Sequence, residues 1–176
     1  IYRRLNARRP EIERDEQYYQ GKQPLAFATE EWKAANAARY AGFSDNWCGT
    51  VVDAEAERLK PTGFVIPDFE SGGDLLWRQF QRNDFDAQFS QGVRTALAAR
   101  RAYVIVWGDG DEESVITFEH PANVEIEYEW ENPRVRRAAL KTWVDESMEY
   151  ATLYTPDYLF KWERKRTSAP DDQKSQ

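Results

Sequence analysis

The sequence has very little of the chemistry that active sites and metal centres require. Its 176 residues include one cysteine, one histidine and one methionine. A single cysteine, Cys48, excludes an internal disulfide and a cysteine-rich metal site. Zinc sites use four Cys, His or carboxylate ligands, and nitrogen and sulfur ligands are nearly missing here. We therefore expect no bound metal, no cofactor and no catalytic residue.

Other familiar signals are missing too. No stretch approaches the roughly 20 consecutive apolar residues that cross a bilayer, and no signal-peptide pattern is present. The glycine-rich phosphate-binding motifs G-x-x-x-x-G-K-[ST] and G-x-G-x-x-G after a strand do not occur, which disfavours nucleotide hydrolysis. Cys48 and His120 lack a third orienting group, and we expect Cys48 to be a small buried residue of a helix. An acidic turn with Asp109, Asp111, Glu112 and Glu113 does not match the spacing of a calcium-binding loop.

The charge balance argues against a globally basic nucleic-acid binder. The net charge is −7, and residues 1–60 hold ten Lys/Arg against ten Asp/Glu, so the whole excess of acid lies in residues 61–176. Three basic clusters, Arg3 to Arg9, Arg134 to Arg137 and Arg164 to Arg166, keep local phosphate or single-strand contacts open.

Aromatic residues are abundant. They make up 14% of the chain and include seven tryptophans, more than one modest core usually needs. Large aromatic side chains anchor both cores and protein–protein interfaces. Four of them, Trp32, Trp47, Trp77 and Trp107, are our candidate core or subunit-interface anchors.

The first 100 residues predict about five helical segments. They cover 1–21 (with Pro10 able to start a second segment), 29–41, 44–60, 74–82 and 84–100. Ser44 is the expected N-cap of the third segment, and Trp47, Val51, Ala54 and Leu59 are its expected buried stripe.

The rest predicts an antiparallel β meander of strands near 102–107, 114–119, 124–130, 134–143, 150–154 and 158–162. The first of these runs is continuously apolar, as in a strand covered on both faces. Helices followed by strands, without βαβ alternation, indicate an α+β fold. A cross-strand charge ladder is expected between two sets of residues, Glu125, Glu127 and Glu129 on one strand and Arg134, Arg136 and Arg137 on the next.

Several stretches together resemble the portal proteins of tailed bacteriophages, above all those of siphophages that infect actinobacteria. These are Tyr18 to Leu25 (YYQGKQPL), Asn46 to Phe64, Arg101 to Trp107 (RAYVIVW), His120-Pro121 and Leu153 to Asp157 (LYTPD). The likeness covers nearly all of residues 2–163 in the expected order. One departure is Arg100, where relatives often have glycine. A larger one is length, because family members continue into stem, clip and crown elements.

The resemblance implies a wing-like segment, with helices over 1–100, a β-rich part over 101–163 and a polar tail or linker over 164–176. It also implies a homo-oligomeric ring, typically a dodecamer, at the unique capsid vertex of the virion. Such a ring contacts the major capsid protein, the head–tail adaptor and the terminase motor, passes double-stranded DNA without reading its sequence, and touches no membrane. The alternatives are a stand-alone α+β module that binds protein or nucleic acid, and a hydrolase that uses Asp or Glu.

Overall fold

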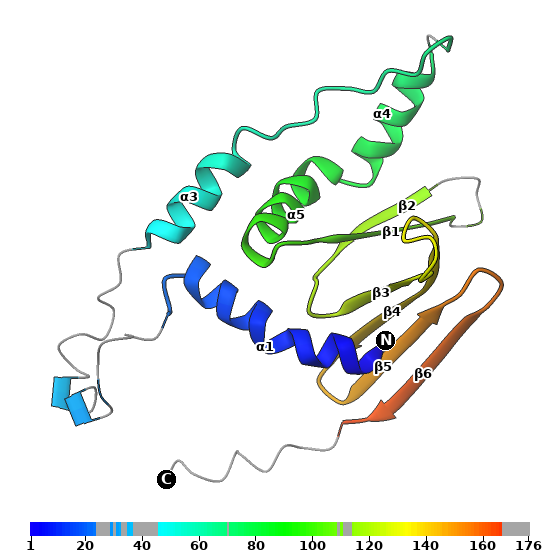
Figure 1. Cartoon of the computed structure of the whole chain (residues 1–176). Helices are drawn as coiled ribbons and strands as arrows, with labels where there is room; N and C mark the ends of the chain where they lie inside the picture. Colours follow the sequence, from blue (N-terminus) through cyan, green and yellow to red (C-terminus); the bar gives the residue numbers. More distant parts are fainter. Residues whose placement is uncertain are drawn as a thin grey trace. The chain divides into compact units, whose positions relative to one another are not determined.

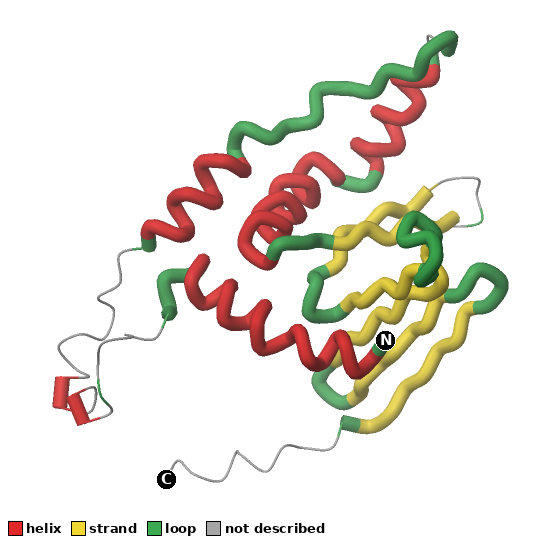
Figure 2. Tube along the Cα trace, viewed as in Figure 1, coloured by secondary structure: helices red, strands yellow, loops and turns green. Residues whose placement is uncertain are grey.

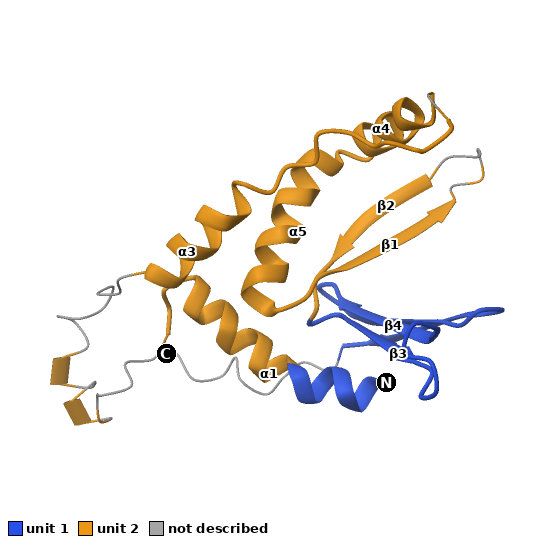
Figure 3. Cartoon of the chain, turned by 45° about the horizontal axis from the view of Figure 1, so that its top comes forward, with its two compact units in different colours: residues 1–8, 122–176 blue, residues 9–121 orange. Residues whose placement is uncertain are grey.

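The computed structural model describes residues 1–23, 29, 31–32, 35–36, 46–69, 71–108, 110 and 114–166. Figure 1 shows helices first and strands after them, which confirms the α+β class. The chain divides into two compact units, one of residues 1–8 and 122–176 and one of residues 9–121 (Figure 3). The predicted boundary at residue 100 lies where the composition changes, whereas the two compact units meet in the sequence at residues 8–9 and 121–122. The assignment of residues 1–100 and 101–163 to parts of a portal wing stays a prediction.

The described residues form four helices in place of the predicted count of about five. They are α1 (Tyr2–Tyr19), α3 (Trp47–Ala56), α4 (Gly72–Arg82) and α5 (Phe85–Ala99). The segment predicted over 29–41 lies mostly outside the described residues, although the Thr29 hydroxyl accepts a hydrogen bond from the backbone N–H of Trp32, as an N-cap does. Helix α1 runs through Pro10 as one helix, so the predicted second start there is wrong.

Helix ends follow local chemistry. Gly21 has a φ of 69°, and the Lys22 N–H donates to the Gln17 carbonyl at 2.7 Å, so α1 ends in a glycine C-cap. The N-cap of α3 is Asn46, whose side chain accepts from the Gly49 N–H; the predicted cap, Ser44, lies outside the described residues. Helix α3 also ends at Ala56, about one turn before residue 60, where the predicted segment ends.

The unit of residues 9–121 has an aromatic core. Strands β1 (Tyr103–Gly108) and β2 (Ser114–Glu119) form an antiparallel hairpin, and α5 packs on β2. Phe85 stacks on Phe118 at 4.9 Å between ring centroids and meets Phe80 edge-on at 5.0 Å. Gly92 fits over the Phe118 ring, because a Cβ there would lie 2.3 Å from it. Side-chain volume therefore fixes how closely α5 approaches the hairpin.

The unit of residues 1–8 and 122–176 contains a four-stranded antiparallel sheet in the order β3-β4-β5-β6. Its strands are β3 (Val124–Tyr128), β4 (Arg136–Val144), β5 (Met148–Tyr154) and β6 (Leu159–Lys165), coloured as strands in Figure 2. The predicted meander is thus two sheets. Strand β6 continues through Arg164 and Lys165, which were predicted to belong to a polar tail, because the Arg164 Nε donates to Glu149 across the sheet at 2.6 Å.

The β4–β5 turn is organised by one carboxylate. Asp145 accepts hydrogen bonds from the N–H groups of Ser147 and Met148 at 2.8 and 2.7 Å and from the Tyr150 hydroxyl at 2.9 Å. These bonds, led by the one from Ser147, lower the pKa of Asp145. The hydrogen bond between the Tyr150 hydroxyl and Asp145 raises the pKa of Tyr150.

We predict that the stability that Asp145 contributes is lost in acid. A lowered folded-state pKa means that the contribution is fully present above the unfolded-state pKa of about 4 and disappears as the pH falls through the folded value. The difference in urea midpoint between the native chain and Asp145→Ala should therefore be largest near pH 7 and shrink below about pH 4. A difference that stays constant down to pH 2 would contradict this assignment.

Candidate assembly surfaces

The residues predicted to be poor in ligand and active-site chemistry can now be located in the structure. No group of three or more His, Cys, Asp or Glu residues among those described could hold a metal ion. Cys48 is exposed on α3, so the prediction that it is buried is wrong. His120 binds Glu16. The acidic residues Asp109 and 111–113 lie outside the described residues. No described helix is long and apolar enough to cross a membrane.

Helix α3 is held by its polar side. The Asp53 carboxylate accepts from the Tyr19 hydroxyl at 3.0 Å and from Arg94 Nε at 3.1 Å, which joins α1, α3 and α5. Partial burial and then the bond to Asp53 raise the pKa of Tyr19. Beside this network, a Cβ on Gly49 would lie 2.8 Å from the Tyr19 carbonyl oxygen, so only glycine permits this approach.

As a result, the predicted buried stripe of α3 faces solvent. Trp47 is 72% exposed, and Val51 and Leu59 are exposed as well, whereas Gly49 and Ala56 are buried. The prediction assigned the core to the bulky apolar side. The structure buries the small residues Gly49 and Ala56, which allow close approach of neighbouring elements, while the half-exposed Asp53 ties α3 to Tyr19 and Arg94.

The four candidate tryptophans divide into two pairs. Trp77 stacks on Phe80 at 5.0 Å and Trp32 is half-buried. Trp47 and Trp107 are exposed in the single chain, so they do not anchor its core, and an anchoring role would require contact with another chain. Their role at a subunit interface stays a prediction.

The predicted charge ladder does not form between β3 and β4 at its first two glutamates. The register places Leu140 opposite Glu125 and Ala138 opposite Glu127, and Arg136 stands opposite Tyr128 after a bulge. Both glutamates instead bind α1: Arg8 pairs with Glu125 and donates to the Val124 carbonyl at 2.7 Å, while Arg4 lies 3.4 Å from Glu125 and 4.0 Å from Glu127. Glu129, Arg134, Arg136 and Arg137 are exposed.

Two surfaces of the four-stranded sheet carry exposed aromatic rings. Phe160 and Trp162 of β6 stack at 6.0 Å between centroids. Trp143 stacks on Tyr150 at 5.2 Å, and the Lys141 ammonium lies 5.3 Å from the Trp143 ring. At the β3–β4 turn, Trp130 is 94% exposed next to the exposed Arg134 and Arg136.

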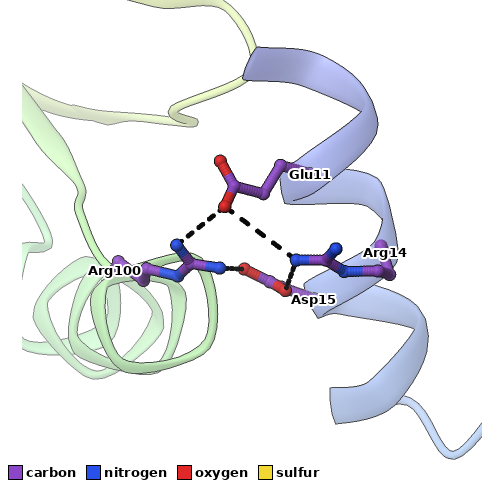
Figure 4. Close-up of polar contacts among 4 residues, drawn as sticks. All are labelled: Glu11, Arg14, Asp15 and Arg100. Atoms are coloured by element: carbon purple, nitrogen blue, oxygen red, sulfur yellow. Dashed lines mark hydrogen bonds and ion pairs between the residues drawn. The ribbon is translucent and has the colours of Figure 1, made fainter.

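Arg100 occupies a position that suits glycine. It ends α5 with a φ of 65°, a left-handed conformation that L-residues rarely adopt. Its guanidinium spans two carboxylates of α1, at 2.8 Å from Glu11 and 2.8 Å from Asp15, and Arg14 contacts the same pair (Figure 4). These bonds, led by the one to Glu11, raise the pKa of Arg100. The ion pairs offset the backbone strain, so a tight helix-to-strand turn forms without glycine.

We predict that Arg100→Gly is less destabilising than Arg100→Ala. Both lose the ion pairs with α1, but only glycine removes the left-handed strain. The advantage of arginine over glycine should also shrink in 1 M NaCl, because the screening length falls to about 3 Å. Urea unfolding of the three proteins at low and high salt measures both effects. A larger loss for the glycine variant than for the alanine variant would overturn the strain argument.

A shallow pocket of about 450 Å³ lies where the segment after α3 reaches α4, lined by Phe64, Val65, Ile66, Asp68, Phe69 and Gly73. Its lining contains one charged side chain and no set of converging polar groups, so it does not resemble a small-molecule site. What the described residues do present is a set of exposed apolar and aromatic side chains.

Comparison with known proteins agrees with this picture. The chain matches the family described as "Phage portal protein, SPP1 Gp6-like" over residues 1–176. It is also 29% identical, over 126 residues, to the portal protein of Mycobacterium phage D29, an alignment that covers 64% of this chain. That alignment spans 25% of the relative, so this chain corresponds to about a quarter of its length. The match over every residue shows that the chain belongs to the phage portal protein family of the SPP1 Gp6-like type.

Proposed function

We propose that this protein is the subunit of a homo-oligomeric portal ring at the unique vertex of a phage capsid. The observation that carries the proposal is the family match over residues 1–176. The exposed Trp47, Val51 and Trp107 support it, because a monomer rarely leaves so many large apolar side chains in water. The ring is expected to be a dodecamer.

In this role the protein is structural. The ring provides the conduit through which double-stranded DNA enters during packaging and leaves during infection. It docks the terminase motor and later the head–tail adaptor, and it sits within the shell of the major capsid protein. The motor supplies the ATP hydrolysis, which agrees with the missing phosphate-binding motifs of this sequence. Assembly takes place in the host cytoplasm, and the finished ring resides in the virion.

Native mass spectrometry and electron microscopy of the full-length protein test the proposal. A closed ring of one subunit type supports it, and the mass gives the subunit number. A protein that stays monomeric at micromolar concentration, with or without capsid protein, contradicts it.

One observation favours a second candidate, a nucleic-acid contact at the β3–β4 turn. Trp130 and the arginines at 134, 136 and 137 are exposed there, and an aromatic ring among cations can stack on a base while the cations hold phosphates. A mobility shift of single-stranded DNA that falls steeply with salt and disappears in Trp130→Ala would support this candidate. Equal mobility with and without protein would exclude it.

A further inference from the structure

The two sheets have four outer edges, and three of them are protected in whole or in part. On β2, the Asn83 side chain donates to the Ser114 carbonyl at 2.9 Å and accepts from the Ile116 N–H at 2.8 Å, and Gln88 accepts from the Phe118 N–H at 3.3 Å. These amides take the place of a neighbouring strand. An unprotected edge invites pairing with another chain, so such blocking is common in proteins.

The edges of the four-stranded sheet are protected in other ways. On β3, protection is partial: the outward carbonyl of Val124 accepts from Arg8, whereas no described residue bonds the outward groups of Ile126. On β6, the Thr155 N–H donates to the Tyr158 carbonyl, and the Arg166 N–H donates to the Ser147 carbonyl. The even-numbered residues of β6 therefore direct their backbone N–H and C=O groups towards β5. Its outward positions beyond Leu159 are therefore Lys161, Glu163 and Lys165, and charged residues discourage pairing at an edge.

The edge of β1 has no such protection. Because Ser114, Ile116 and Phe118 direct their backbone groups outward, the β1 residues opposite them, Val104 and Val106, direct theirs away from β2. No residue in the described part of the chain forms a hydrogen bond with these groups of Val104 or Val106, and their side chains are 46% and 61% exposed. The run Tyr103 to Trp107 contains no charge, no proline and no bulge. This composition is typical of a strand covered on both faces. Because Val104 and Val106 are exposed, that prediction is wrong for the single chain.

The segment between α3 and α4 also has unpaired backbone N–H and C=O groups. Residues 62–65 lie outside any helix or strand, and their N–H and C=O groups have no hydrogen-bond partner among the described residues. Val65 is 92% exposed, while the Phe64 carbonyl points at Gly73, where a Cβ would lie 2.3 Å from that oxygen. Pro61 and Pro67 bound the segment, and each biases the residue before it towards an extended conformation.

We propose that Thr62 to Ile66 of one copy adds as a strand to the open β1 edge of the next copy. Main-chain hydrogen bonds would satisfy both unpaired edges, the mode known as strand addition. Within one chain the two segments lie on opposite sides of α4 and α5 in both Figure 1 and Figure 3, so one copy cannot pair with itself. Two different patches that meet head to tail generate a ring when the rotation closes. The inference thus rests on the proposed portal function and names its subunit contact.

Flanking charges select the antiparallel arrangement. In the sequence, Arg101 precedes β1 and Asp109 follows it, and Lys60 precedes the segment and Asp68 follows it. Antiparallel pairing brings Lys60 towards the acidic end of β1 and Asp68 towards Arg101, whereas parallel pairing brings like charges together.

Cysteine cross-linking of the full-length protein tests the contact directly. In a Cys48→Ser background, Val65→Cys is combined with Val104→Cys or with Val106→Cys, because paired strands bring Cα atoms within disulfide range. Under oxidation we expect a ladder of covalent oligomers from at least one pair, and the same link when the two single-cysteine proteins are mixed. Val65→Cys with Val144→Cys, an exposed residue of the other sheet, is the control and should stay monomeric on denaturing gels.

A proline variant adds a second readout. Val106→Pro removes the outward N–H of β1 without removing a bond to β2, so the single chain should fold while ring formation is lost. Val106→Thr keeps the N–H and should form rings. If the native protein forms rings but neither cysteine pair cross-links and Val106→Pro assembles normally, the strand-addition inference is overturned and the portal proposal stands. If the native protein forms no ring, the portal proposal fails by itself.

Discussion

Replacing Phe85 with alanine is expected to lower the free energy of unfolding of this chain by about 3 to 5 kcal/mol. Phe85 is buried and contacts two other rings, Phe80 and Phe118, at centroid distances of 5.0 and 4.9 Å. Truncation removes both aromatic contacts and leaves a cavity between α5 and the hairpin. The midpoint of thermal unfolding should fall by about 6 to 20 °C, which differential scanning calorimetry can measure.

Trp47→Ala is the matched control for this prediction. It removes a larger ring, but one that is 72% exposed, so the single chain should change by less than about 0.5 kcal/mol. Equal losses for the two variants would show that the aromatic cluster is not the core of its unit. In full-length protein the same Trp47→Ala variant also tests the tryptophan as an interface anchor, because an anchor affects assembly and leaves subunit stability unchanged.

Replacing Arg8 with methionine is expected to cost about 3 kcal/mol of unfolding free energy. The Glu125 carboxylate is buried, and Arg8 supplies its closest cation as well as a hydrogen bond to Val124. Removing one partner leaves a desolvated charge. Arg4, 3.4 Å from the same carboxylate, keeps the loss near the lower end of the usual range for a broken buried pair.

A double-mutant cycle separates the pair from simple packing. Arg8→Met combined with Glu125→Met replaces both charges by apolar groups and should recover much of the stability lost in Arg8→Met alone. Arg3→Met, in the same basic cluster but exposed, should change the unfolding free energy by less than about 0.5 kcal/mol. Additive losses in the double variant would mean that Arg8 and Glu125 do not act as a pair. Urea titration monitored by tryptophan fluorescence of the native protein, Arg8→Met, Glu125→Met, the double variant and Arg3→Met supplies these values.

Local chemistry was enough to predict most elements. The apolar and turn patterns place α4, α5 and all six strands within a few residues, because side-chain periodicity and Gly, Pro and Asn turns act over short distances. The scarcity of cysteine and histidine and the lack of phosphate-binding motifs are compatible with a protein from a structural family.

Contacts between distant residues could not be predicted in this way. The basic cluster of α1 and the glutamates of β3 are 116 and more positions apart, and each has a plausible local explanation, as helix electrostatics or as a ladder with β4. The amides of Asn83 and Gln88 carry no signal in the sequence that they would block an edge 30 or more residues away. Asn83 follows α4 as a helix-ending residue, and only packing aims it at β2.

By itself the sequence determined the α+β class, the order of the elements and the likeness to portal proteins, since these depend on composition and short-range pattern. Only the tertiary structure decided which side of α3 is buried, which strand edges are blocked and which cation meets Glu125. Those outcomes depend on close approach, at Gly49 and Gly92 for example, and on register, where a shift of one residue exchanges the two faces of a strand. The exposed edge of β1 is the most important feature that only the tertiary structure revealed.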